Sequence, residues 1–389
     1  MSKEEQMKKI KIITLFLFLF ILCIPHQIEA VEEEVLESQK SNLNISDFVS
    51  EAEKYTKENF GDLNINELLN SAIKGEVDNE TIFKQILSKL GGEVTSLITV
   101  LGSILVIIVV HSILKAISEN LGNKSISQIT YYVQYILIVT LIMANFTQII
   151  QMTKEAIENL VGFMNCLVPV LMTLMLATGS ITSVGVIEPV ILFLINFISN
   201  LLNTIILPLV LVITVLAIIS KVSDKIQIDK LAKFGKSSIV WILGIILTIF
   251  VGVVSLEGSL TSSVDGITAK ATKAAVSNFI PVVGKVLGDA VDTVLGCSLI
   301  LKNAVGVVGV IVLIGICILP ILKLGILTIS YHLAAAVCQP IADEKIVKLL
   351  EQMGDTFKIL LAILFSISVM FIIGTTIVIK ISNSGMMYR

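Results

Sequence analysis

Long uncharged stretches, interrupted by short charged ones, fill the chain from residue 94 to residue 380. Several of them exceed the roughly 20 apolar residues that an α-helix needs to cross the hydrocarbon core of a bilayer. Residues 94–154 contain two such stretches, Val94–Leu114 and Tyr131–Ile150, which we predict to be transmembrane helices. With the apolar blocks that follow, the pattern predicts an all-α, polytopic helical membrane protein that crosses the bilayer about 8–10 times.

The composition excludes an ordinary soluble domain. Hydrophobic residues make up 55% of the chain, charged residues make up 15%, and the mean hydropathy is +0.92. A soluble domain contains about 25% charged residues. No basic patch typical of a nucleic-acid-binding protein is present, so we expect the lipid bilayer, and not a nucleic acid, to surround this chain.

Residues 1–30 have the organisation of a secretory signal peptide. Four lysines precede the apolar segment Ile12–Ile24, and Ile28-Glu29-Ala30 suits a cleavage site. An uncleaved membrane anchor is the alternative. In both cases the segment that follows is exported, so we expect it to be extracytoplasmic.

Residues 31–93 are the only sizeable polar part of the chain, and residues 31–90 carry thirteen Asp and Glu against six Lys. Apolar residues recur at helical spacing in three segments, 46–59, 64–74 and 79–90, with Ser46 and Asn79 as N-caps and Gly61, Gly75 and Gly91 as stops. About 60 residues bury only a marginal core on their own. We therefore predict an acidic, helical docking module rather than a catalytic domain.

The membrane part shows signs of an internal duplication. Pro169 and Pro281 are separated by 112 residues, and so are Pro208 and Pro320. The spacing predicts membrane repeat 1 at residues 155–257 and membrane repeat 2 at residues 258–380, followed by a tail at 381–389. Duplication is a common origin of membrane transporters.

Each predicted repeat contains one apolar run that is too long for a single straight crossing. The runs at 186–220 and 303–338 have 35 and 36 residues. Each suits either a hairpin of two short helices or one long kinked helix. Two hairpins would make the repeats parallel, whereas a re-entrant element in each repeat would make them inverted.

A polar stripe opens the last third of the chain. A helix over residues 281–302 would place its polar residues on one narrow face between apolar ones. The candidate path or interface comprises Asn278, Pro281, Gly284, Lys285, Asp289, Asp292, Lys302 and Asn303. Two interpretations stay open: a polar wall inside a membrane assembly, or the wet side of a helix that lies on the bilayer.

Two further charges fall within apolar blocks. Glu188 precedes Pro189 at the start of a block, so we expect it at the membrane interface. Lys323 follows Pro320 by three residues, so its side chain would reach the interface if the chain turns at that proline.

The sequence lacks the motifs of common catalytic, nucleotide and metal sites. It contains no P-loop, no HExxH, no GxSxG and no CxxC, and its three histidines lie far apart. Asp289 and Asp292 could mimic a catalytic carboxylate pair, but a nearby lysine and the lack of another acid/base set make catalysis the weaker interpretation. We predict a protein that is not an enzyme and has no catalytic residue, cofactor or metal.

Three segments resemble the stage III sporulation protein AE family. They are Phe279-Ile280-Pro281-Val282-Val283-Gly284, Asp289-Ala290-Val291-Asp292-Thr293-Val294 and Lys302-Asn303-Ala304-Val305-Gly306. The order of signal sequence, acidic helical segment and multispanning body is similar to that family along essentially the whole chain.

The resemblance implies a function in endospore formation. It implies a subunit of a channel or secretion-like complex in the mother-cell membrane, required for late forespore gene expression. The implied partners are the sister stage III sporulation A-operon proteins, including an ATPase subunit, and indirectly stage II sporulation protein Q. The alternative that the residues leave open is an autonomous secondary transporter of small solutes.

Overall fold

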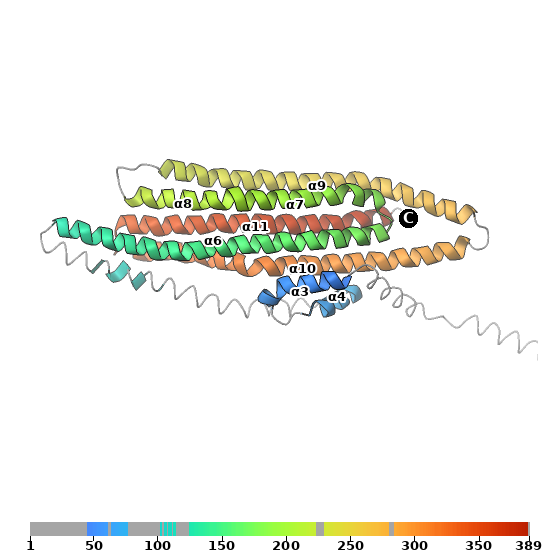
Figure 1. Ribbon diagram of the computed structural model, residues 1–389, viewed down its shortest axis with the longest axis horizontal. Helices are drawn as coiled ribbons and strands as arrows, with labels where there is room; N and C mark the ends of the chain where they lie inside the picture. Colours follow the sequence, from blue (N-terminus) through green and yellow to red (C-terminus); the bar gives the residue numbers. More distant parts are fainter. Residues whose placement is uncertain are drawn as a thin grey trace, which may run out of the picture.

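The secondary structure of the described residues is helical throughout (Figure 1). The computed structural model describes residues 45–60, 64–76, eight positions between 102 and 113, 124–222, 229–279 and 284–387. The helices are α3 (Ile45–Phe60), α4 (Ile65–Lys74), α6 (Lys124–Ala177), α7 (Ile181–Leu201), the π-helix η1 (Leu202–Ile206), α8 (Leu207–Val222), α9 (Asp229–Phe279), α10 (Gly284–Cys338) and α11 (Glu344–Met387). The predicted signal peptide lies outside these residues.

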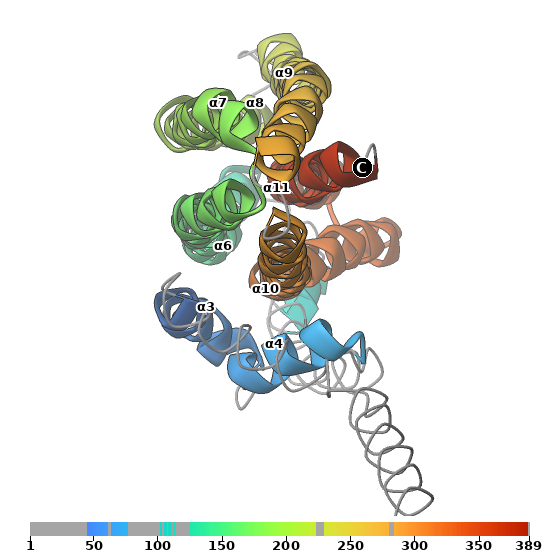
Figure 2. The same cartoon turned by 90° about the vertical axis from the view of Figure 1, so that its right-hand side faces the viewer.

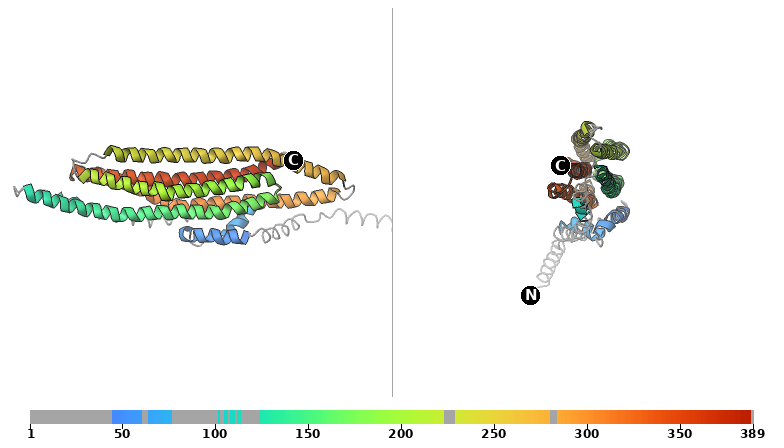
Figure 3. Two further views of the ribbon diagram at one scale, coloured as in Figure 1. Left: turned by 45° about the horizontal axis from the view of Figure 1, so that its top comes forward. Right: turned by 90° about the vertical axis from the view of Figure 1, so that its left-hand side faces the viewer.

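Helix α11 forms the centre of a bundle of long, nearly parallel or antiparallel helices. It packs against α6, α8, α9 and α10, so that neighbouring helices cover most of its sides (Figure 2). Phe357, Leu360, Leu364 and Phe371 of α11 are fully buried. The two short helices α3 and α4 lie outside the bundle, against α6 and α10 (Figure 3).

The prediction of an all-α, polytopic membrane protein is confirmed. Five helices in the described part of the chain are long and apolar enough to cross a membrane. Helices α6, α9 and α10 have 54, 51 and 55 residues. At 1.5 Å per residue they are about 80 Å long, more than twice the thickness of a hydrocarbon core of about 30 Å. The bundle therefore extends beyond the bilayer.

Each of the two long apolar runs forms one long helix and not a hairpin. Helix α7 continues into α8 through the single π-helical turn η1, which ends just before Pro208. A wider turn before a proline lets the helix continue, because proline has no N–H to donate and its ring conflicts with the carbonyl of the preceding turn. Helix α10 passes through Pro320 without a break. The larger predicted number of crossings depended on hairpins, and the described residues contain five candidate spans instead.

The predicted repeat boundaries fall inside continuous helices. The boundary 154/155 lies within α6, and the boundary 257/258 lies within α9. The helix pair α7–α8 and α9 nonetheless runs in the same two directions as the pair α10 and α11 (Figure 1). A duplication stays a prediction, and the two pairs are its natural units.

Two of the three predicted N-terminal helices are present, and the third, 79–90, lies outside the described residues. Asn64 is the N-cap of α4, because its Oδ1 accepts hydrogen bonds from the N–H groups of Asn66 at 3.0 Å and Glu67 at 3.3 Å. Gly75 ends α4 with φ of 74°, as predicted. Ser46 lies inside α3 and is not its N-cap.

Aromatic side chains attach α3 to the long bundle. Phe48 and Tyr55 of α3 lie against Phe163 of α6, with ring centroids 6.2 and 6.0 Å apart. Gly162 leaves the space for the Tyr55 hydroxyl, which would be in steric conflict with a Cβ at that position. Helix α3 of the predicted docking module is thus packed against the membrane body of its own chain.

We expect Gly374→Ala to destabilise the bundle, because α9 and α11 touch at this glycine. A Cβ at Gly374 would lie 2.9 Å from two ring atoms of Phe250, and that ring is fully buried. Overpacking of this kind costs about 1–3 kcal/mol. The matched control is Gly252→Ala on α9, where a Cβ meets no atom within 4 Å. Thermal unfolding in detergent measures both, and equal midpoints for the two variants would contradict this packing.

Candidate functional site: polar side chains of the bundle

The predicted stripe is divided between two helices. Asn278 lies in the last turn of α9, and Gly284 is the first residue of α10. Pro281 and the side chains of Asn278, Lys285 and Asp289 lie outside the described part of the structure. Asp292 is half-buried. The stripe helix is thus the beginning of α10 rather than a separate element, and its role as a path or an interface stays a prediction.

Lys302 is buried in the contact between α10 and α11. Its Nζ donates a hydrogen bond to the backbone oxygen of Ile379 at 2.8 Å. One turn later, Gly306 lies against the side chain of the same isoleucine. Burying an ammonium group is costly unless hydrogen bonds replace its hydration. Lys302 therefore fixes the register of α10 on α11.

Asn303, Glu188 and Lys323 are all half-buried. Asn303 Oδ1 is buried without a hydrogen-bond partner among the described residues. Glu188 is the eighth residue of α7, so it does not lie at the start of its helix. The turn at Pro320, on which an interfacial position of Lys323 depended, is absent from α10.

Asp265 of α9, which we did not predict, closes the N-terminus of α7. Its two carboxylate oxygens accept hydrogen bonds from the N–H groups of Thr182 and Ser183, both at 2.9 Å. Its side chain is nearly fully buried. Ser180, at the N-cap position, makes no capping hydrogen bond with its side chain. The negative charge also matches the positive end of the helix dipole.

A second group missed from the sequence joins three helices at the end of the bundle where α8 and α10 terminate. Asp355 of α11 lies 4.0 Å from Lys236 Nζ of α9 and 3.7 Å from His332 Nε2 of α10. Lys236 also donates to the backbone oxygen of Gln352 at 3.4 Å. Their sequence separations exceed 20 residues, so no local motif indicates this cluster.

A third feature missed from the sequence is a row of exposed and half-exposed polar residues on α6, which we call the α6 polar stripe. It comprises Thr147, Gln148, Gln151, Lys154, Glu155, Glu158 and Asn159. The sequence predicted a transmembrane helix that ends at Ile150 and a membrane repeat that begins at residue 155, and it singled out none of these residues. Because α6 is continuous from Lys124 to Ala177, these charges lie in the middle of a long helix.

The arrangement supports helix association and contact with water or protein. Among the described residues, no three His, Cys, Asp or Glu side chains come together as ligands of a metal ion. The polar groups instead hold helix ends, fix the register of helices and occupy one exposed face.

Asp265→Ala is expected to lower the free energy of unfolding by about 0.5–2 kcal/mol, because two N–H groups of α7 lose their acceptor. Asp265→Asn keeps one acceptor oxygen, so its loss should be smaller. Ser180→Ala is the matched control, since this side chain does not cap α7. Unfolding of the detergent-solubilised chain measures all three, and an unchanged stability of Asp265→Ala would show that the cap contributes nothing.

Comparison with known proteins gives two matches that agree. Residues 63–382 match the protein family described as stage III sporulation protein AE. The chain is also 32% identical over 306 residues to the stage III sporulation protein AE of Bacillus subtilis (strain 168). This alignment covers 79% of the chain and 77% of the relative. No solved structure matches.

The family match includes α4 and every long helix of the bundle, and it extends to residue 382 within α11. The resemblance noted in the residues between 278 and 306 is thereby confirmed. A helical, multi-pass membrane architecture and a family match over most of the sequence lead to one conclusion. The chain belongs to the stage III sporulation protein AE family.

Proposed function

We propose that this protein is a multispanning subunit of a channel or secretion-like complex that links mother cell and forespore. In this function it is required for late forespore gene expression and for spore formation. The single observation that carries the proposal is the family match over residues 63–382. The partners would be the sister stage III sporulation A-operon proteins and, indirectly, stage II sporulation protein Q.

A non-catalytic function fits the polar groups of the bundle. Lys302 and Asp265 make hydrogen bonds that connect helices, and the Asp355 cluster joins three of them. The sequence contains no P-loop. Energy for transport through the complex would therefore come from the ATPase subunit.

The charge distribution supports an orientation in the mother-cell membrane. The segment 221–238 carries five Lys against two Asp. The end of α8 and the start of α9, which flank it, lie at one end of the bundle (Figure 1). The positive-inside rule assigns such a segment to the cytoplasm. Helices α3 and α4 lie away from that end, beside the middle part of the long helices (Figure 1). The N-terminal segment would then be extracytoplasmic and would face the intermembrane space.

The second candidate function is an autonomous secondary transporter. It is favoured by the two helix pairs that run in the same directions and by charged residues within apolar helices. Such a transporter would carry a solute across vesicles that contain the purified chain alone. A subunit of a complex would show no such uptake.

Deletion of the gene is expected to block sporulation after engulfment while vegetative growth stays normal. The block arises because the forespore loses its connection and late gene expression fails. Counts of heat-resistant spores and a late forespore reporter measure the effect, and the full-length gene supplied in trans is the control. Normal spore numbers in the deletion strain would exclude the proposed function.

A further inference from the structure

The exposed side of α6 differs from the other outer surfaces of the bundle. Between Leu141 and Leu176, every exposed residue of α6 other than Ala144 is polar. Positions 147, 151, 155 and 158 follow the three- and four-residue spacing that places side chains on one face of a helix. The α6 polar stripe is thus a continuous surface along the helix.

Hydrogen bonds and ion pairs within the stripe do not remove its need for water. Gln151 Nε2 donates to Glu155 Oε1 at 2.8 Å, and Lys154 Nζ lies 3.7 Å from Glu158 Oε1. The side chains of Lys154 and Glu158 are 45% and 51% exposed. These carboxylates and the ammonium group keep about half of their surface available to the surroundings.

Contacts with α11 fix the level of the stripe along the bundle axis. Phe146 of α6 lies 6.1 Å from Phe357, and Met164 Sδ accepts a hydrogen bond from Thr375 Oγ1 at 3.6 Å. Residues 151–159 of α6 therefore lie beside the stretch of α11 between Phe357 and Thr375. This stretch belongs to a candidate membrane span.

Contacts of α9 with α11 fix the level of its apolar surface in the same way. Lys236 lies 4.0 Å from Asp355, and the ring centroid of Phe250 lies 6.4 Å from that of Phe371. Residues 237–256 of α9 carry no charge. These 20 residues correspond to about 30 Å, the thickness of a hydrocarbon core.

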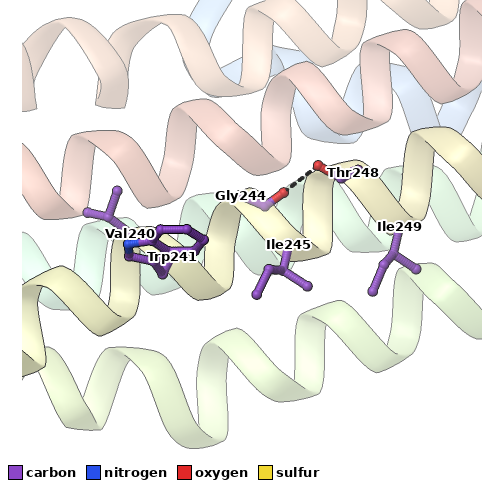
Figure 4. A pocket seen from close by; sticks show the side chains of 6 residues that line it. All are labelled: Val240, Trp241, Gly244, Ile245, Thr248 and Ile249. Carbon is purple, nitrogen blue, oxygen red and sulfur yellow. Dashed lines mark hydrogen bonds between the residues drawn. The ribbon is translucent and has the colours of Figure 1, made fainter.

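The two surfaces at this level are chemically opposite. Val240, Trp241, Ile245 and Ile249 of α9 are all exposed and form an apolar surface around Gly244 and Thr248 (Figure 4). Because it is apolar, this surface is suited to contact with lipid. The α6 polar stripe lies at the same depth, where ionised side chains that face hydrocarbon are costly.

A second element beside the stripe has the same character. Helix α3 contacts Phe163 of α6, just beyond the stripe, and its buried face includes Phe48 and Ala52. Its outer face exposes charged residues, among them Glu53 and Lys54. On the α7 side, Asn196 exchanges amide hydrogen bonds with Asn165 of α6 at 3.2 and 3.3 Å. The polar surface thus continues from α6 onto α3, and the two asparagines lie at its border with α7, which exposes Phe193 and Phe197.

We propose that the α6 polar stripe lines a water-filled space at the depth of the bilayer, which protein and not lipid separates from the hydrocarbon. The side of the bundle formed by α9 faces lipid. The proposal is independent of the proposed function, because it concerns what surrounds α6 in the membrane and not which process the chain serves.

Cysteine labelling tests the proposal directly. Gln151→Cys and Asn159→Cys are placed singly in the full-length chain, and membrane vesicles from sporulating cells are exposed on both surfaces to a charged, membrane-impermeant thiol reagent. We expect these thiols to react at least about tenfold faster than a thiol in lipid, because only a hydrated thiol forms the reactive thiolate.

The matched control variants are Ile245→Cys and Ile249→Cys, at the same level on α9. They should react with an uncharged, lipid-soluble maleimide and not with the charged reagent. The wild-type chain measures the background from its native cysteines, of which Cys297, Cys317 and Cys338 are buried. Gln151→Cys and Asn159→Cys each introduce a small neutral side chain on an exposed surface. The amount of each variant in the membrane should therefore equal that of the wild type.

Slow labelling of both α6 variants by the charged reagent, at the rate of the α9 controls, would overturn the proposal. That result would mean that lipid or a tightly packed protein chain covers the stripe. Fast labelling of the α6 variants, combined with normal spore numbers in a separate deletion strain, would support the water-filled space and exclude the proposed function. The two proposals can therefore fail independently.

Discussion

Hydrocarbon cannot hydrate a charge, and this constraint organises the whole bundle. Each charged side chain of the long helices needs a place where water or protein replaces the lost hydration. Lys236 and Asp355 form an ion pair at the end of the bundle, and Lys302 donates a hydrogen bond to a backbone oxygen of the central helix. The charged residues of α6 lie together on one polar face of the bundle. The apolar surface of α9 is the part that lipid can cover without such a cost.

Several of these charged side chains have their partner on α11, because this helix is at the centre of the bundle. Helices α9 and α10 both pack on it. Its backbone accepts a hydrogen bond from Lys302, and its side chains contact Lys236 and the ring of Phe250. Because the helices are about 80 Å long, the bundle reaches beyond the bilayer and offers surfaces outside it. A membrane protein of the stage III sporulation protein AE family with such a shape is well suited to contact other subunits both within and outside the lipid.

The prolines of the two long apolar runs show how the structure realises one of the two alternatives that the sequence left open, one long helix in each run. The lengths of the two apolar runs left a hairpin or one long kinked helix open, and a proline, which removes a helical hydrogen bond, lies within each run. In a long apolar helix, a π-helical turn and neighbouring helices compensate for that loss. The π-helix η1 before Pro208 is this compensation, and α10 continues past Pro320 within the bundle. Gly75, in contrast, ended its helix as predicted, since its positive φ is a local property of the chain.

The sequence by itself determined the helical membrane class, the positions of α3 and α4, and the family, because these depend on hydropathy, local periodicity and short motifs. Only the tertiary structure decided what each charge faces. The predicted transmembrane helix ended at Ile150, just before Lys154, Glu155 and Glu158, yet α6 is continuous and its contacts place these charges beside the candidate membrane span of α11. Asp265 caps a helix that begins 84 residues before it. Depth and partnership are relations between helices distant in sequence, so no local pattern can encode them.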